Sequence, residues 1–147
     1  MSSTLFQRII VPVANKDDAE ATTAALTPYV DATTSTVIAV HVIEKAGGAP
    51  DKASVEQREL FADEAFERVA DGLEDVELQT EYLYGTDVAA AIIDAAHDLD
   101  ASAIVITPRG SSQWLKLLTG DVTAGLVNKS DIPIIVLPDH SDEEDTQ

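Results

Sequence analysis

Residues 103–110 read Ala-Ile-Val-Ile-Thr-Pro-Arg-Gly, a β-branched apolar run that stops at a proline and a glycine. A short run of this kind between turn residues is typical of a strand buried on both faces. Glycine at its end allows the backbone to approach a ligand closely. The stretch therefore predicts a buried parallel strand that leads into a functional loop.

Outward from this strand, strand-like and helix-like segments alternate along the chain. We expect strands over residues 8–13, 36–43, 76–82, 103–107 and 132–138. We expect helices from a cap at Asn15 or Asp17 to about residue 29, and over residues 54–73, 87–99 and 121–129. Strict alternation implies α/β architecture, with a single doubly wound parallel sheet of five strands and helices on both faces.

The strand order follows from the residues at the strand ends. Right-handed crossovers leave a cleft at the carboxyl ends of the strands, where the order reverses. The orders 3-2-1-4-5 and 2-1-3-4-5 are both familiar. A phospho-receiver with the second order would need aspartates after the first strand and a lysine after the fifth. The first strand instead ends Val13-Ala14 and the fifth ends Leu137-Pro138, which favours 3-2-1-4-5.

Apolar spacing also predicts local details of the helices and of one strand. Pro28 weakens the end of the first helix, and Ser54 with Gln57 resembles a capping box at the start of the second. Apolar and polar residues largely alternate over 76–82, as in a strand at a sheet edge. The expected buried stripes are Ala25, Leu26, Tyr29 and Val30 in the first helix, Ala62, Phe66, Val69 and Leu73 in the second, and Val88, Ile92, Ala95 and Leu99 in the third.

Composition limits the classes of partner and the compartment. The 147 residues include 9 Lys and Arg against 27 Asp and Glu, a net charge of −18, and no cysteine. This charge disfavours nucleic acid and anionic membrane surfaces, and no apolar run approaches the ~20 residues of a membrane span. With no signal-like start, we expect a cytoplasmic protein adapted to concentrated salt. Residues 1–138 form the expected domain, and 139–147 an acidic, disordered tail.

The segment after the fourth strand carries the strongest functional signal. Thr107-Pro108-Arg109-Gly110 is followed by nine residues and then by Gly120-Asp121-Val122-Thr123 at the start of a helix. Exposed N–H groups at a helix start attract anions. The pattern is compatible with phosphate binding, although Gly110 could equally be a plain turn residue and Asp121 an ordinary helix cap.

Over residues 6–138 the chain resembles the universal stress protein family. The matching features are Arg109, Gly110, the nine-residue gap, Gly120, Gly85 at the start of the third helix, and Val40-His41-Val42. The resemblance implies the 3-2-1-4-5 order (an adenine nucleotide alpha hydrolase-like fold), a stress-response role and usually a homodimer. The nucleotide-cleft positions it implies are Pro12, Val13, Ala14, Val42, Thr107, Arg109, Gly110, Gly120, Asp121, Val122 and Thr123.

Three of these positions depart from the pattern of the family's nucleotide binders. Thr107 replaces the first glycine of the loop, Asp121 replaces a Ser or Thr, and Ala14 replaces an aspartate that helps to hold the nucleoside. Two unit charges ~4 Å apart repel by ~4 kcal/mol at an effective dielectric of ~20. A carboxylate at 121 therefore opposes phosphate, unless a magnesium ion bridges the two.

These departures favour a regulatory protein that acts by binding rather than by turnover. We expect no cofactor, no metal site and no catalytic residue. The alternative is an ATP or AMP sensor that uses the cleft after the first and fourth strands, with Mg²⁺; a slow nucleotide hydrolase is a third and weaker hypothesis. Some relatives act beside membrane transporters, so a transporter or another regulatory protein is the partner we consider.

The fifth strand predicts a dimer. In the preferred order it lies at a sheet edge, yet Pro133–Leu137 is apolar and carries no charge. Exposed edges of this kind pair with other chains unless they are blocked. We expect a second copy to pair with it, although a helix or the tail could cover it instead.

The histidines and the tryptophan give weaker signals. His41 lies in an apolar strand and is expected in the core or in the wall of the cleft. His97 is expected at the solvent edge of the third helix, and His140 lies in the acidic tail. Trp114 is expected to act as a hydrophobic plug on the loop. No Gly-x-Ser-x-Gly motif or metal-ligand spacing is present.

Overall fold

The computed structural model describes residues 5–13, 15–44, 52–107 and 121–137, and only the backbone of 52–54 and 121–124. Its helices and strands follow the order predicted from the sequence. They are β1 (Arg8–Pro12), α1 (Lys16–Leu26), the 3₁₀ turn η1 (Thr27–Tyr29), β2 (Thr36–Glu44), α2 (Lys52–Gly72), β3 (Glu77–Gly85), α3 (Val88–Asp98), β4 (Ala103–Ile106), α5 (Asp121–Lys129) and β5 (Ile134–Val136).

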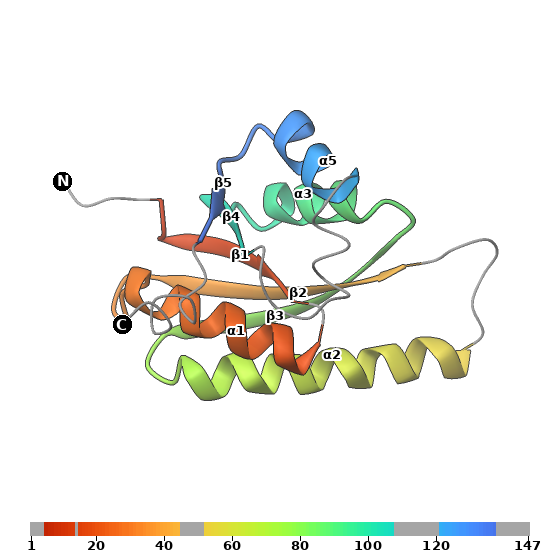
Figure 1. The fold of residues 1–147 in the computed structure, drawn as a ribbon, viewed down its shortest axis with the longest axis horizontal. Helices are drawn as coiled ribbons and strands as arrows, with labels where there is room; N and C mark the ends of the chain where they lie inside the picture. Colours follow the sequence, from red (N-terminus) through yellow and green to blue (C-terminus); the bar gives the residue numbers. More distant parts are fainter. Residues whose placement is uncertain (1–4, 14, 45–51, 108–120, 138–147) are drawn as a thin grey trace, which may run out of the picture.

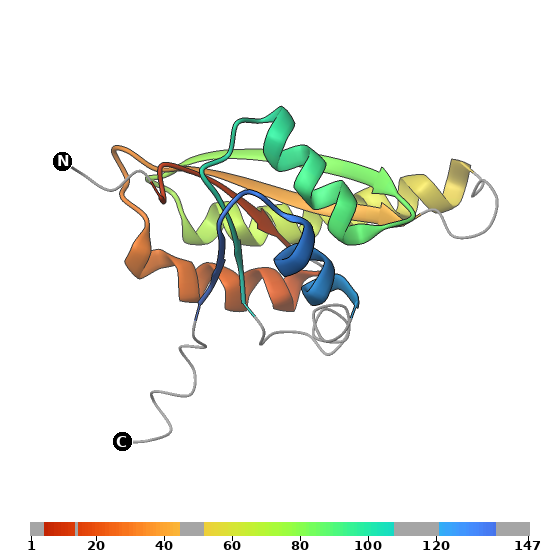
Figure 2. The same cartoon turned by 90° about the horizontal axis from the view of Figure 1, so that it is seen from above.

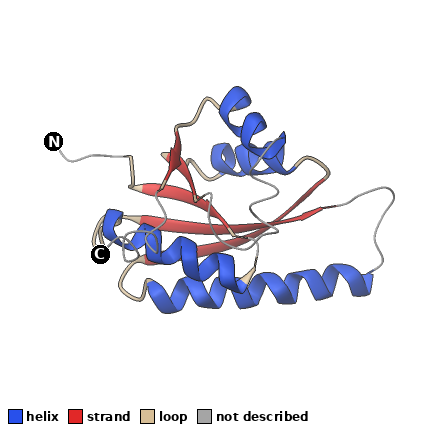
Figure 3. Ribbon diagram, in the orientation of Figure 1, coloured by secondary structure: helices blue, strands red, loops and turns tan. Residues whose placement is uncertain are grey.

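The described strands form one parallel sheet in the order β3-β2-β1-β4-β5. Helices α1 and α2 lie against one face, and α3 and α5 lie against the other (Figures 1 and 3). Seen from above, β4 and β5 are strongly rotated relative to β2 and β3 (Figure 2), as sheet twist requires. The predicted doubly wound architecture and strand order are confirmed.

Two apolar cores hold these layers together. Beneath α1 and α2, Ile9 and Val37 of the sheet pack with Leu26 and Phe66 of the helices. Successive side chains of a strand point to opposite faces, so the alternate strand residues Ile10, Ile38 and Ile104 belong to a second core. There they pack with Ile92 of α3 and Leu126 of α5. At the edge, β3 has no fully buried side chain, which agrees with its alternating sequence.

The first helix begins where the sequence predicts and ends earlier. Asn15 is the N-cap, and its Oδ1 accepts a hydrogen bond from the Asp18 N–H at 2.9 Å. Because proline cannot continue an α-helix, α1 stops at Leu26 and Pro28 falls in the 3₁₀ turn. The prediction that Tyr29 belongs to the buried stripe is therefore wrong: its side chain is 44% exposed and stacks on Phe6.

Other boundaries also differ from the sequence-based prediction. Strand β3 runs on to Gly85, so Gly85 ends this strand and does not open the third helix. Helix α2 starts at Lys52, so Ser54 lies inside its first turn and cannot be the cap of a capping box. Strand β5 is also shorter than residues 132–138, although its hydrogen bonds extend beyond it: Ile104 N–H donates to the Pro133 carbonyl, and Leu137 N–H donates to that of Ile106.

The buried faces of α2 and α3 match the prediction. Ala62, Phe66, Val69 and Leu73 are buried in α2, and Val88, Ile92 and Ala95 in α3, with Leu99 packed partly buried after it. Asp87 caps α3 by accepting from the Ala90 N–H at 3.1 Å. None of the helices in the described ranges is long and apolar enough to cross a membrane.

Candidate functional site

The predicted cleft positions gather where the strand order reverses. Strand β1 lies between β2 and β4 in the sheet, so the carboxyl ends of these three parallel strands meet at one edge. Pro12 is the last residue of β1, Val42 lies near the carboxyl end of β2, and Thr107 directly follows β4. In open α/β sheets this edge is where ligands bind.

The structure describes the remaining predicted positions only in part. Asp121, Val122 and Thr123 form the first turn of α5, as predicted, and only their backbone is described. Ala14, Arg109, Gly110 and Gly120 lie outside the described residues, as do Trp114 and His140. The structure thus brings Pro12, Val13, Val42 and Thr107 to a common edge.

The turn from β1 to α1 is tied to β2 through Val13. The Val13 N–H donates to the Val40 carbonyl at 2.9 Å, and the Val13 carbonyl lies 2.8 Å from His41 Nδ1. A carbonyl oxygen only accepts, so Nδ1 carries the proton of this bond. Both backbone polar groups of Val13, its N–H and its carbonyl, are therefore hydrogen-bonded to residues of β2.

His41 stands half-buried on the α1–α2 side of the sheet. Burial lowers the pKa of its imidazole, the hydrogen bond to Val13 works in the opposite direction, and the positive charge of Arg58 on α2 lowers it further. Because the net shift is downward, His41 is neutral at pH 7. Its position agrees with the expectation of a histidine in the core or in the cleft wall.

Thr107 is anchored beneath α1. Its hydroxyl lies 2.8 Å from that of Thr22, and both side chains are almost fully buried. The sequence identified Thr107 only as a replacement for the first glycine of the loop, and it did not identify Thr22 as part of the site. The signal for Thr22 was its spacing: it lies four residues before Leu26, on the buried face of the same helix.

Helix α5 packs closely against α3. A Cβ added at Gly125 would lie 2.9 Å from the Ala89 Cβ, so the two backbones approach more closely than side chains usually allow. This contact fixes the helix whose first turn contains Asp121. Unsatisfied N–H groups at such a helix start carry a partial positive charge.

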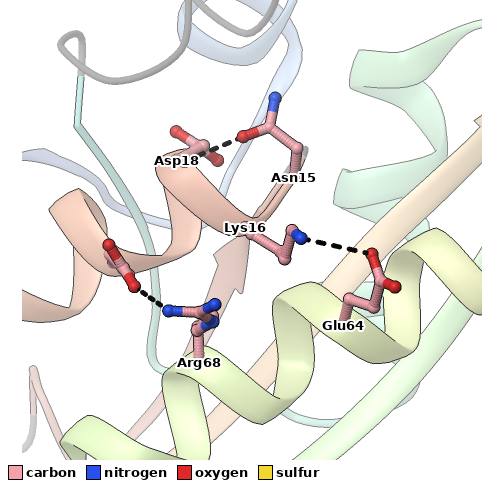
Figure 4. A network of polar contacts seen from close by, with 6 residues as sticks. Asn15, Lys16, Asp18, Glu64 and Arg68 are labelled. Carbon is pink, nitrogen blue, oxygen red and sulfur yellow. Dashed lines mark hydrogen bonds and ion pairs between the residues drawn. The ribbon is translucent and has the colours of Figure 1, made fainter.

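Charged side chains join α1 to α2 on the outside of this layer (Figure 4). Lys16 Nζ lies 3.9 Å from Glu64 Oε1, and Arg68 pairs with Glu20. These side chains are about half exposed, so each pair contributes little to stability. Asp18, by contrast, is fully buried in the first turn of α1, where the helix dipole favours a carboxylate.

The histidine of α3 and the acidic residues suggest no further centre. His97 is exposed, as predicted, with Nε2 2.8 Å from Asp131 Oδ1. Within the part of the chain that the structure covers, no three His, Asp or Glu side chains form a metal-binding group.

A parallel sheet of this order defines a doubly wound α/β protein, a class in which ligands bind at the carboxyl ends of the strands beside the reversal point. The model of the universal stress protein family matches residues 5–138. The chain therefore belongs to the universal stress protein family.

Solved structures of the family share the fold. A universal stress protein from Archaeoglobus fulgidus is 25% identical, with a TM-score of 0.67 over 90% of this chain and 98% of that one. The structure of the A. fulgidus protein in complex with dAMP is 21% identical (TM-score 0.65; 90% and 98% covered). A family protein from Arabidopsis thaliana with AMP bound is 18% identical (TM-score 0.65; 93% and 94% covered). No curated protein sequence matches the chain.

Proposed function

We propose that this protein is a regulatory stress-response protein that binds an adenosine monophosphate at the carboxyl edge of β1, β2 and β4, without turning it over. The observation that carries the proposal is the pairing of β1 with both β2 and β4. That pairing places Pro12, Val13 and Thr107 at the reversal point of a family fold. Of the two main hypotheses raised by the sequence, we thus favour the nucleotide sensor.

Nucleotides bound to relatives support the choice of ligand. Two of the structures described above contain dAMP and AMP, and another universal stress protein was solved in complex with cAMP. Each of these ligands carries a single phosphate group. Their sequences are 15–21% identical to this chain, so the assignment also needs support from its own residues.

The environment of Thr107 weakens one objection to a ligand. Its hydroxyl is engaged with Thr22 under α1 and the side chain is 2% exposed. A ligand above β4 would then meet the backbone of Thr107 rather than its side chain. The replacement of glycine at this position is therefore compatible with binding.

Asp121 limits the number of phosphates that the site accepts. It is the first residue of α5, the position at which a helix would otherwise attract anions. Repulsion between its carboxylate and a ligand grows with the charge of the ligand. We therefore propose that AMP binds more tightly than ATP, and that Mg²⁺ narrows the difference by neutralising the phosphates.

Titration calorimetry in molar salt tests this order of affinities. Wild-type protein should bind AMP more tightly than ATP. Asp121→Ser removes the repulsive carboxylate and should improve ATP binding by a factor of roughly 10–100, which corresponds to about 1.4–2.8 kcal/mol. AMP binding should improve by less, because AMP carries less charge. Equal gains for both ligands, or ATP binding as tight as AMP binding in the wild type, would contradict the role of Asp121. Absence of AMP binding in the wild type would contradict the proposed function.

The setting of this function is also a proposal. The high density of acidic residues supports a location in the cytoplasm of a cell with a high salt concentration. The apolar β5 edge supports a homodimer, which could present the bound nucleotide to a transporter or to another regulatory protein. Copurification of partners at high salt, with and without AMP, would test whether the nucleotide controls such an assembly.

A further inference from the structure

The carbonyl of Val13 is held by a side chain and not by the sheet. Strand β1 ends at Pro12, whose partner in β2 is Val40. One residue further on, the Val13 N–H still donates to the Val40 carbonyl, but the Val13 carbonyl accepts from His41 Nδ1 at 2.8 Å. His41 thus extends the attachment of β1 to β2 by one group into the turn before α1.

The register of β2 with β3 determines which side chain lies beside His41. His41 pairs in register with Tyr82 of β3, so both side chains lie on the face covered by α2. The Tyr82 ring packs at 6.1 Å from that of Phe66, and its hydroxyl donates to Asp63 Oδ1 at 2.5 Å. Within the sheet, His41 therefore lies between Tyr82 of β3 and the Val13 carbonyl at the end of β1.

The hydrogen bond does not depend on the charge of the ring. The neutral imidazole donates from Nδ1, and the imidazolium carries a proton on both nitrogens. Lowering the pH would therefore add a charge near Arg58 without removing the donor that Val13 needs. The interaction has the properties of a permanent support and not of a pH switch.

A permanent support at this place has a consequence for ligand binding. Residue 14, which follows Val13 in this turn, is an alanine and has no polar side chain, so Val13 and Ala14 offer a ligand only their backbone groups. Backbone groups recognise a ligand only if they are fixed before it arrives, because ordering them on binding costs affinity. The group best placed to fix Val13 is His41.

We propose that His41 is a positioning residue of the nucleotide site, which orients the β1–α1 turn by holding the Val13 carbonyl. This inference rests on the proposed function, since it names a residue that supports the same site. It assigns to His41 no contact with the nucleotide.

Three substitutions separate positioning from direct contact. Asn places its side-chain amide near the position of Nδ1, so His41→Asn keeps the donor to Val13. Gln reaches the position of Nε2 instead, and His41→Phe fills the ring volume with neither donor. AMP titrations should give a dissociation constant within about threefold of wild type for His41→Asn, and about tenfold weaker for His41→Phe and His41→Gln.

Amide hydrogen exchange at Val13, measured by NMR without nucleotide, provides a second readout. Exchange should be faster in His41→Phe and close to wild type in His41→Asn, because the Val13 N–H lies beside the lost bond. Two results would overturn the proposal: wild-type AMP affinity in His41→Phe, or wild-type affinity in His41→Gln with loss in His41→Asn, which would indicate direct contact through Nε2.

The two readouts also distinguish failure of this inference from failure of the proposed function. If the wild-type protein does not bind AMP, the proposed function fails, and exchange at Val13 decides whether His41 orients the turn. Unchanged exchange in His41→Phe would overturn the positioning role whatever the protein binds.

Discussion

Two threonine hydroxyls meet beneath α1, one from the helix and one from the end of β4. Thr22 and Thr107 are 1% and 2% exposed, and their oxygens lie 2.8 Å apart. Each is a polar group that burial would penalise without the other. This pair couples the position of α1 to the residue that leads into the candidate phosphate loop.

Replacing both hydroxyls should therefore cost less stability than the two single replacements added together. We expect Thr22→Val or Thr107→Val to lower the free energy of unfolding by about 1–3 kcal/mol, because the remaining hydroxyl is left buried and unsatisfied. The double variant should be less destabilised than the sum of the two. Urea denaturation of the four proteins in molar salt measures this coupling, and additive effects would show that the hydroxyls do not interact.

His41 makes stability depend on pH in a defined direction. Burial, opposed by the Val13 bond and reinforced by the charge of Arg58, leaves the pKa of His41 below 6.5 in the folded protein. As the pH falls through about 6.5, the unfolded chain binds a proton that the folded chain does not, so the folded state loses stability. The loss ends once the pH is below the folded pKa.

The free energy of unfolding should thus fall between pH 8 and pH 5.5, and by less in His41→Asn than in the wild type. Equal losses in His41→Asn and in the wild type would contradict this account of His41.

At the scale of elements, the sequence was sufficient for the order and type of the helices and strands. Continuous apolar runs such as 103–106 mark buried strands, and the alternation in β3 marks an edge. Boundaries were less predictable where two signals compete. Pro28 stopped α1 before an apolar stripe that ran on to Tyr29, and the start of α2 at Lys52 overrode the capping pattern at Ser54.

The candidate site was predictable to the extent that it depends on topology. The resemblance to the universal stress protein family named Pro12, Val13, Val42 and Thr107 as cleft positions, and the strand order brings these four residues to one edge. The bond from His41 to Val13 and the pair of Thr22 with Thr107 join residues 28 and 85 positions apart in the chain. Such contacts depend on how α1 and β2 pack in three dimensions, which no local pattern encodes.

The packing of α5 on α3 decides whether alanine at position 125 raises or lowers stability, because the Ala89 Cβ lies next to this position. Alanine normally stabilises a helix by about 1 kcal/mol relative to glycine. At Gly125 the added Cβ would lie 2.9 Å from that of Ala89, and overpacking costs about 1–3 kcal/mol. Gly125→Ala should therefore destabilise the wild type but stabilise an Ala89→Gly background, as measured by thermal or urea unfolding. Stabilisation in both backgrounds would show that the helices can move apart freely.

For the whole molecule, the net charge of −18 opposes any assembly of identical chains. The Debye length falls from about 10 Å at 0.1 M salt to about 3 Å at 1 M, so concentrated salt removes most of this repulsion. An apolar contact is strengthened under the same conditions by salts that are excluded from protein surfaces. A dimer of this chain would therefore be favoured by the ionic strength that its composition suggests.

The β5 edge is where we expect that dimer to form, and Val136 allows a direct test. Its side chain is 56% exposed on the last strand of the sheet, and a charge on a strand edge is the usual block to pairing. Val136→Arg should convert a dimer into a monomer in light scattering at 2 M NaCl, whereas Val127→Arg, at a residue of α5 that is 60% exposed, should remain dimeric. Because both substitutions add the same charge to an exposed valine, a difference between them would locate the contact at β5. A monomeric wild type, or equal dissociation of both variants, would show that this edge does not join two copies.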